Sequence, residues 1–267
     1  MGFQVTVYDR YDRAGGLLTY GIPGFKLEKD VVMRRVKLLE DGGVTYKLNV
    51  NIGVDLSFAE LRGQHDAVLI ATGVYKSRDL GGPGAGLGGI VPALDYLTAS
   101  NRLNFGDTVA EIEDGTLDAK GKAVVVIGGG DTAMDCVRTA IRQGASEVHC
   151  LYRRDRENMP GSQTEVSNAI EEGVQFRFNV QALEVIEEQG RASAVSAPAP
   201  IRKPPPTPSS PVSRPMNSPA ARQRAGRHTA GRRWSWRPRS ISVPAMSRIA
   251  EKISISVCGG NRLVPRE

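Results

Sequence analysis

The sequence predicts an α/β fold of the Rossmann type, arranged in two domains and followed by a disordered basic C-terminal tail. The wholly apolar segment Ala123–Ile127 is typical of a strand buried on both faces of a parallel sheet, and a glycine turn and a helical pattern follow it directly. Charge separates the tail from the rest. Residues 1–190 carry 20 Lys and Arg against 27 Asp and Glu, whereas residues 191–250 carry 12 Lys and Arg, no acid and 11 of the 16 prolines.

Composition and cysteine content exclude several classes of protein. The chain has 267 residues, of which 40% are hydrophobic and 24% charged, as in globular proteins. Its longest apolar runs, residues 68–71 and 124–127, are far shorter than the roughly 18–20 residues of a membrane span, so we expect no membrane segment. Cys136, Cys150 and Cys258 form no C-x-x-C pair, which favours a cytoplasmic location, and they are too few to ligate an iron–sulfur cluster.

The first half of the chain has the pattern of alternating strands and helices. The expected elements are, in order, a strand over residues 2–8, a glycine-rich loop to residue 24, a helix over 30–39, a strand near 44–50, a helix over 55–62, a strand over 67–71, a glycine-rich loop over 81–89 and a helix over 93–103. Asp55 is the expected N-cap of its helix. The run 67–71 is wholly apolar, so we expect it to be buried in a parallel sheet.

A second unit follows a polar connection over residues 107–121. Its expected elements are the strand Ala123–Ile127, a turn over Gly128–Thr132, a helix with Ala133 at the start of its apolar face that stops at Gly144, a strand over Glu147–Tyr152, a helix over 164–172 that stops at Gly173, and a strand over 174–180. Helical patterning continues to about residue 188, and we expect periodic structure to end there. This succession predicts a βαβ unit.

The strongest motif is Gly128-x-Gly130-x-x-Ala133, between an expected strand and an expected helix. The first glycine permits a tight turn, the second lets the backbone approach a pyrophosphate, and the small third residue allows the helix to pack closely on the strand. The helix N-terminus offers unpaired N–H groups to an anion. The motif therefore predicts dinucleotide binding, the alternative being a turn that is only structural.

The residues about 20 positions further on distinguish between the two nicotinamide cofactors. Enzymes that use NAD place a carboxylate there to accept from the ribose 2′-OH, whereas this chain has Arg153 and Arg154. Two guanidinium groups suit a 2′-phosphate, so the sequence predicts NADPH. The alternative is that both arginines belong to a solvated run of charges with Asp155, Arg156 and Glu157.

Several motifs together resemble a known family. They are Tyr8-Asp9-Arg10, Gly15-Gly16-Leu17-Leu18-Thr19-Tyr20-Gly21-Ile22-Pro23, Lys26-Leu27-Glu28-Lys29, Ala71-Thr72-Gly73, Gly128 to Cys136, Tyr152-Arg153-Arg154-Asp155, Asn158-Met159-Pro160-Gly161-Ser162 and Glu171-Glu172-Gly173-Val174. Over about residues 2–188 the chain resembles the small (beta) subunit of bacterial NADPH-dependent glutamate synthase. That family belongs to the two-dinucleotide flavoprotein reductases, in which an NADPH-binding domain interrupts an FAD-binding domain.

The resemblance implies a role for individual residues. For FAD, it implies Asp9 at the adenosine ribose, Gly16 and Leu17 at the flavin nucleotide, Val50 at the adenine, and Thr72 and Gly73 closing the site. For NADPH, it implies Gly128, Gly129, Gly130, Asp131 and Thr132 around the pyrophosphate, Arg153 and Arg154 at the 2′-phosphate, and Glu165 toward the nicotinamide. Without the resemblance, Asp9 would be an ordinary turn residue, because no glycine turn precedes its strand.

The chemistry that the resemblance implies is hydride transfer from nicotinamide C4 to flavin N5. It needs positioning and exclusion of water rather than a side-chain acid or base, so we nominate no catalytic residue. In the family, electrons then pass through iron–sulfur clusters to the large subunit, which makes glutamate from glutamine and 2-oxoglutarate. The large subunit is therefore the expected partner.

The sequence also departs from the family pattern. The family's cysteine-rich segment and first FAD glycine turn would precede Met1, and the Gly-Asp motif expected after residue 190 is replaced by the basic stretch. We therefore expect a partial FAD-binding domain over residues 1–115, a partial NADPH-binding Rossmann domain over 116–190, and a disordered or out-of-frame tail over 191–267. We also expect weak FAD retention.

Three alternatives remain open at the level of sequence. The chain could be a related NADPH:acceptor oxidoreductase of the ferredoxin-reductase or dihydropyrimidine-dehydrogenase type, or an inactive truncated remnant. A nucleic-acid-binding role of the tail, through its arginines and Trp234 and Trp236, is disfavoured because no groove-reading motif accompanies them.

Overall fold

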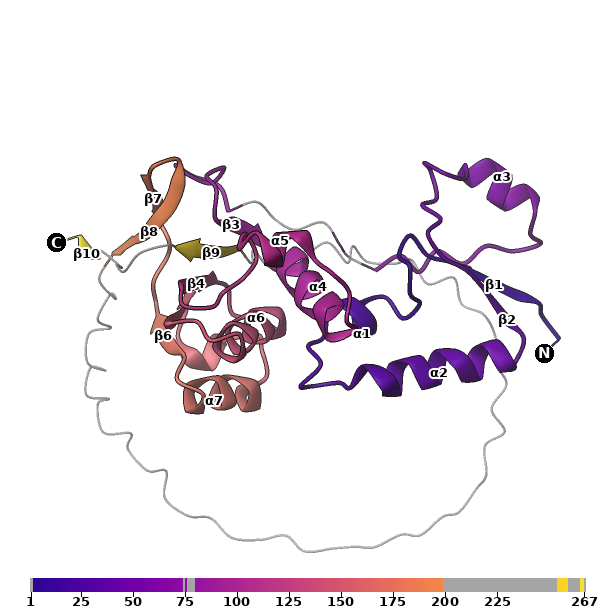
Figure 1. Ribbon diagram of the computed structural model, residues 1–267, viewed down its shortest axis with the longest axis horizontal. Helices are drawn as coiled ribbons and strands as arrows, with labels where there is room; N and C mark the ends of the chain where they lie inside the picture. Colours follow the sequence, from indigo (N-terminus) through magenta and orange to yellow (C-terminus); the bar gives the residue numbers. More distant parts are fainter. Residues whose placement is uncertain (1, 74, 76–79, 199–253, 259–264, 267) are drawn as a thin grey trace, which may run out of the picture. The chain divides into compact units, whose positions relative to one another are not determined.

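The computed structural model describes residues 2–73, 75, 80–198, 254–258 and 265–266 (Figure 1). Within these residues the largest sheet has the strand order β3-β9-β4-β5-β6. Its strands are β3 (Ile90–Pro92), β9 (Ser254–Cys258), β4 (Ala123–Ile127), β5 (Glu147–Tyr152) and β6 (Gln175–Phe178). β4, β5 and β6 run parallel, and β9 runs antiparallel to both β4 and β3. The predicted bounds of β4 and β5 are confirmed.

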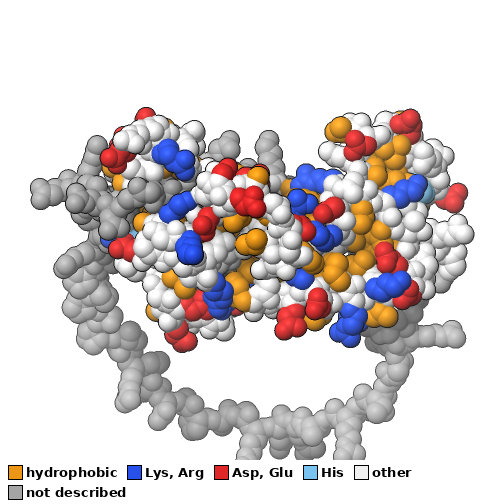
Figure 2. Space-filling view, in the orientation of Figure 1, with side chains coloured by type: hydrophobic (Ala, Val, Ile, Leu, Met, Phe, Trp, Pro, Cys, Tyr) orange, Lys and Arg blue, Asp and Glu red, His pale blue; other side chains and the backbone are white. Residues whose placement is uncertain are grey.

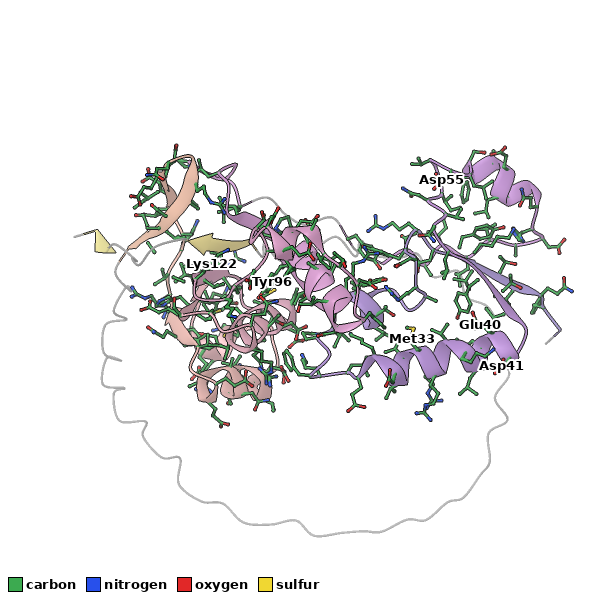
Figure 3. All side chains as sticks on the ribbon, in the orientation of Figure 1. Met33, Glu40, Asp41, Asp55, Tyr96 and Lys122 are labelled. Atoms are coloured by element: carbon green, nitrogen blue, oxygen red, sulfur yellow. The ribbon has the colours of Figure 1, made fainter. Side chains whose placement is uncertain are left out.

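Three helices accompany this sheet: α4 (Ala93–Asn104), α6 (Asp131–Arg142) and α7 (Gln163–Glu171). α6 joins β4 to β5 and α7 lies between β5 and β6, which is the predicted βαβ succession. On α6, Met134 and Val137 are fully buried and belong to the same hydrophobic cluster as Val124 and Val126 of β4. On α4, the buried Tyr96 (labelled in Figure 3) donates from its hydroxyl to Oε1 of Gln143 at 2.8 Å, just after α6.

On the other face of β4 and β5 lies β8 (Arg191–Pro198), which forms a β-hairpin with β7 (Glu184–Glu188). Val195 and Ala197 of β8 pack with Val125 of β4 and Leu151 of β5. The expectation that periodic structure ends near residue 188 is therefore wrong. The apolar residues after the turn at Gly190 pack against one face of β4 and β5. The local sequence pattern alone does not reveal that this face is available.

The C-terminal segments contribute two further strands. β9 inserts between β3 and β4, and β10 (Pro265–Arg266) pairs in parallel with β8. Residues 191–198 and 254–258 therefore take part in sheets, contrary to the expectation of a tail without structure from residue 191 onward. The expectation for residues 199–253 lies outside the described residues.

The N-terminal region forms a separate strand–helix–strand unit. β1 (Val5–Tyr8) pairs in parallel with β2 (Val44–Lys47), and α2 (Lys29–Asp41) lies between them in the chain. The short helices α1 (Leu17–Tyr20), α3 (Phe58–Gly63) and α5 (Ala110–Glu113) complete the described elements, with a 3₁₀ turn, η1, at Arg156–Asn158. Figure 2 shows hydrophobic side chains at the surface of the molecule. On α2, Leu38 and Leu39 are 55% and 52% exposed.

The structure corrects two predictions in this region. Residues 67–71 form no strand: Leu69 is 90% exposed and Ile70 is 69% exposed. A strand needs a paired neighbour to bury it, and within the described residues β1 pairs only with β2. The N-cap of α3 is Ser57 rather than Asp55. Ser57 Oγ accepts from the Glu60 N–H at 3.1 Å, and Glu60 Oε2 accepts from the Ser57 N–H at 3.0 Å, which is a complete capping box.

No described helix has the length and apolar character needed to cross a bilayer.

Candidate dinucleotide site

The glycine turn lies where the motif requires it, between a buried strand and a helix start. β4 ends at Ile127 and α6 begins at Asp131, with Gly130 as its N-cap. The Gly128 N–H donates to the Leu151 carbonyl of β5 at 3.1 Å, which ties the turn to the neighbouring strand end. The N–H groups of Asp131 and Thr132 precede the first hydrogen bond of this helix, which Ala133 donates to the Gly130 carbonyl at 3.0 Å, and they lie at the positive end of the helix dipole. The turn thus has the geometry of an anion-binding helix start.

The middle glycine of the turn has a packing role that the motif did not predict. A Cβ at Gly129 would lie 2.4 Å from Cδ2 and Cε2 of Tyr152, so any side chain there would collide with the ring. The Tyr152 hydroxyl donates to the Asn158 carbonyl at 2.8 Å, which holds the ring in place. In the sequence, the only indication of this contact is the aromatic residue Tyr152 at the end of β5.

The family motif at residues 158–162 packs directly on the glycine turn. The Gly161 N–H donates to the Gly129 carbonyl at 3.0 Å, and a Cβ at Gly161 would lie 3.0 Å from that same oxygen. The Ser162 N–H donates to Oδ1 of Asp131 at 2.8 Å. Asp131 therefore links the starts of α6 and α7. Thr132 is exposed beside it.

Arg153 and Arg154 directly follow β5, at the same sheet edge as the glycine turn, because parallel strands end on the same side. Both are exposed, and neither guanidinium makes an ion pair or a side-chain hydrogen bond with another described residue. The Arg154 carbonyl accepts from the Asn179 N–H at 3.0 Å, which fixes its backbone to the segment after β6. Two exposed cations that have no ion partner among the described residues, beside a helix start that favours anions, fit a phosphorylated ligand.

Glu165 lies in an ion-pair cluster at the start of α7. Its Oε2 is 2.7 Å from Nη1 of Arg138 and 3.3 Å from Nζ of Lys26, and Lys26 also contacts Oδ1 of Asp135 at 2.7 Å. Burial raises the pKa of Glu165, but the hydrogen bonds from Arg138 and Lys26 outweigh it and the net pKa is lowered. Burial also raises the pKa of Asp135, and the Lys26 ammonium opposes that shift.

The ion-pair cluster extends through two arginines of α6 to Glu172, the residue that follows α7. Arg138 and Arg142 both donate to its carboxylate, with Nη2 of Arg138 2.7 Å from Oε1. The hydrogen bond from Arg142, followed by that from Arg138, lowers the pKa of Glu172 to about 2. The ring centroid of Phe25 lies 3.9 Å from the Arg142 guanidinium carbon and 4.9 Å from that of Arg138. The turn that carries Phe25 and Lys26 therefore contacts α6 and α7.

Four of the six residues expected around FAD form two pairs: Asp9 is hydrogen-bonded to Val50, and Gly16 and Gly73 share the neighbour Tyr75. At the ends of β1 and β2, the Asp9 carbonyl accepts from the Val50 N–H at 2.9 Å, and Asp9 Oδ1 accepts from the Tyr11 N–H at 3.1 Å. Gly16 has φ of +54° and precedes Leu17 in α1, and its Cβ position is 3.3 Å from the Tyr75 hydroxyl.

Gly73, the other member of the second pair, has φ of +70°, and its Cβ position is 3.4 Å from Cε2 of Tyr75. Thr72 and Gly73 follow residues 67–71, the segment in which the predicted strand is absent, and they too lie outside any strand. The sequence analysis did not predict Tyr75 as a site residue. Its ring lies beneath the Arg10 guanidinium, whose carbon is 4.4 Å from the ring centroid. Within the described residues, no group of His, Cys, Asp and Glu could hold a metal ion.

The fold and the glycine turn define an α/β protein with Rossmann-like nucleotide-binding units. The family model "Pyridine nucleotide-disulphide oxidoreductase" matches residues 26–198, and the chain belongs to this family. FprA of Mycobacterium tuberculosis, solved in complex with NADPH, matches with a TM-score of 0.58 and 19% identity over 71% of this chain and 55% of that one. At that identity the likeness concerns the fold alone.

Curated relatives confirm the family resemblance that the motifs indicated. The chain is 70% identical over 175 residues to the glutamate synthase NADPH small chain of Azospirillum brasilense, covering 66% of this chain and 36% of the relative. It is 47% identical over 197 residues to that of Escherichia coli K12, covering 73% of this chain and 41% of the relative. The chain thus spans well under half of the length of these two relatives.

Proposed function

We propose that the chain is the NADPH-oxidising flavoprotein subunit of a glutamate synthase, located in the cytoplasm with the large subunit as its partner. One observation carries this proposal. The glycine turn between β4 and α6 leads into a helix N-terminus, which favours an anion, and Arg153 and Arg154, without ion partners among the described residues, follow the neighbouring strand. The relatives named glutamate synthase NADPH small chain supply the identity of the reaction and of the partner.

The proposed roles follow the sequence expectations. Around NADPH they assign the pyrophosphate to Gly128, Gly129, Gly130, Asp131 and Thr132, the 2′-phosphate to Arg153 and Arg154, and the nicotinamide side to Glu165. Around FAD they assign Asp9, Gly16, Leu17, Val50, Thr72 and Gly73. When both cofactors are bound, the chemistry that they supply is hydride transfer from nicotinamide C4 to flavin N5. The residues of the chain bind, orient and exclude water.

The proposed domains are a flavin-binding part over residues 1–115 and an NADPH-binding part over 116–190, which β8 extends. The NADPH part is the better supported of the two, because packing on both faces of its sheet holds the residues assigned to the ligand in place. The FAD residues lie on a unit with exposed apolar side chains. We therefore expect the purified chain to retain little FAD, and an absorbance scan with a flavin band near stoichiometry would contradict this expectation.

The binding test compares NADPH with NADH by calorimetry on the full chain. We expect NADPH to bind at least about tenfold more tightly, since charge-assisted hydrogen bonds to the 2′-phosphate are lost with NADH. The double variant R153S/R154S should bind both equally. The matched control R34S, at an exposed arginine of α2, should keep the preference. An unchanged preference in R153S/R154S would exclude the assigned phosphate site.

A further inference from the structure

The peptide unit between Gly128 and Gly129 has a glycine on each side. Because neither residue has a Cβ, this unit can rotate at little steric cost, and a rotation exchanges the sides on which its carbonyl oxygen and its N–H lie. Its direction matters for an anion, since backbone N–H groups attract negative charge, whereas a carbonyl oxygen repels it. An anion site on this turn therefore needs a contact that fixes the peptide unit.

The thiol of Cys150 supplies such a contact. Its Sγ donates to the Gly128 carbonyl oxygen at 3.4 Å, across 22 positions of sequence. In a trans peptide the C=O and N–H bonds point in opposite directions, so the Gly129 N–H points away from the sulfur. The next carbonyl of the turn, that of Gly129, accepts from the Gly161 N–H at 3.0 Å. Both carbonyls that precede the N-cap of α6 are thus hydrogen-bonded to other parts of the chain.

The surroundings of Cys150 keep its thiol in the form that donates. The residue is fully buried in β5, where it is paired in register with Val126 of β4 and Phe176 of β6. Burial raises the pKa of this thiol to about 12, so the sulfur is protonated at neutral pH. Alanine or valine would also suit a buried strand, but neither could donate to the Gly128 carbonyl.

We propose that Cys150 is a positioning residue for the pyrophosphate of NADPH, because its S–H group holds the Gly128 carbonyl oxygen away from the phosphates. The inference rests on the proposed function and deepens it. Cys150 acts through the backbone of the glycine turn and does not touch the cofactor. The 2′-phosphate site assigned to Arg153 and Arg154 follows the end of β5 and does not depend on this hydrogen bond.

The binding test compares two ligands that share the 2′-phosphate. Calorimetry on the full chain measures the Kd of NADPH directly and the Kd of adenosine 2′-monophosphate, which lacks the pyrophosphate, by displacement of NADPH. We expect C150A to weaken NADPH binding about three- to tenfold, the range that one hydrogen bond typically supplies, and to leave the monophosphate within about twofold. C150S, which keeps a donor on the same Cβ, should recover most of the lost affinity.

A second buried cysteine provides the matched control. Cys136 of α6 is also fully buried and belongs to the same hydrophobic cluster, but its Sγ approaches the Ala93 carbonyl of α4, at 4.0 Å, rather than the glycine turn. C136A therefore removes the same group from the same cluster and should change neither Kd by more than about twofold. If C150A does not fold, as judged by circular dichroism, C150V replaces it, because valine keeps an apolar side chain in the strand without a donor.

The S–H stretching band tests the hydrogen bond itself, without any ligand. Infrared difference spectra of the unsubstituted chain against C150A and against C136A isolate the bands of the two thiols. Donation to a carbonyl weakens the S–H bond, so we expect the Cys150 band at a lower frequency than the Cys136 band, whose sulfur is farther from its acceptor. Equal frequencies would overturn the assigned hydrogen bond and the positioning role with it.

The binding outcomes distinguish the inference from the function on which it rests. Equal weakening of both ligands by C150A, similar weakening of NADPH by C136A, or no recovery in C150S would overturn the positioning role of Cys150 and leave the assigned NADPH site in place. Failure of the unsubstituted chain to bind either ligand would overturn the proposed function together with this inference.

Discussion

The chain contains two strand–helix–strand units of the same local design, and they differ in how much they bury. In the first, β1 and β2 pair around α2; in the second, β4 and β5 pair around α6. The first four residues of β4 are buried, whereas β1 has no buried residue. α6 buries eight of its 12 residues, but α2 buries two of 13.

The difference comes from neighbours rather than from the units themselves. β4 has strands on both sides, α6 on one face and β8 on the other, whereas β1 has one paired strand within the described residues. Burial contributes about 25 cal/mol for each Å² of apolar surface removed from water, so the second unit gains most of the stability. The same local pattern therefore specifies a stable nucleotide-binding unit only when other segments cover it.

The largest expected effect tests this difference directly. M134A, at a fully buried position of α6, should lower the free energy of unfolding by about 2–5 kcal/mol, because it leaves a cavity in the core. L38A, at a 55% exposed position of α2, should change it by less than about 0.5 kcal/mol. Chemical denaturation followed by circular dichroism measures both. Similar losses would mean that α2 is buried in solution.

The next effect concerns the glycine turn. G129A should cost about 1–3 kcal/mol, because the new Cβ would meet the Tyr152 ring at 2.4 Å and force it to move. G63A is the matched control: Gly63 ends α3, and its Cβ position has no atom within 4 Å, so alanine should be neutral or slightly stabilising there. Equal stability of G129A and the unsubstituted chain would show that the Tyr152 ring does not press on the turn.

The smallest effect is a pH dependence of the second unit. The pKa of Glu172 is about 2 in the folded chain, below its ordinary value of 4.5, so its stabilisation is complete above about pH 4.5 and is lost as the pH falls toward 2. The pair with Arg142 is partly exposed, so we expect about 1 kcal/mol. E172Q should flatten the stability profile over this pH range, and E171Q, at its exposed neighbour, should not. A profile that E172Q leaves unchanged would contradict the assigned pairing.

Elements with a strong local pattern were predictable from the sequence. Ala123–Ile127 and Glu147–Tyr152 form strands with the predicted bounds, because the first is wholly apolar, the second is apolar at four of its six positions, and glycine, lysine or serine lies beside them. A helix after the glycine turn was also predicted, and it begins at Asp131, two residues before Ala133, where the sequence pattern placed the start of its apolar face. The placement of Arg153 and Arg154 at the same sheet edge followed from the parallel pairing of these strands.

Contacts between distant segments were decided only by the tertiary structure. Residues 67–71 have the composition of a buried strand but no paired neighbour among the described residues. The apolar residues of β8, in contrast, pack on an otherwise uncovered face of β4 and β5. The fit of Gly129 under Tyr152, and the link from Lys26 to Asp135 and Glu165, depend on side chains that meet only after folding. Local sequence determines which conformation a segment prefers, but burial and ion pairing depend on which other segments reach it.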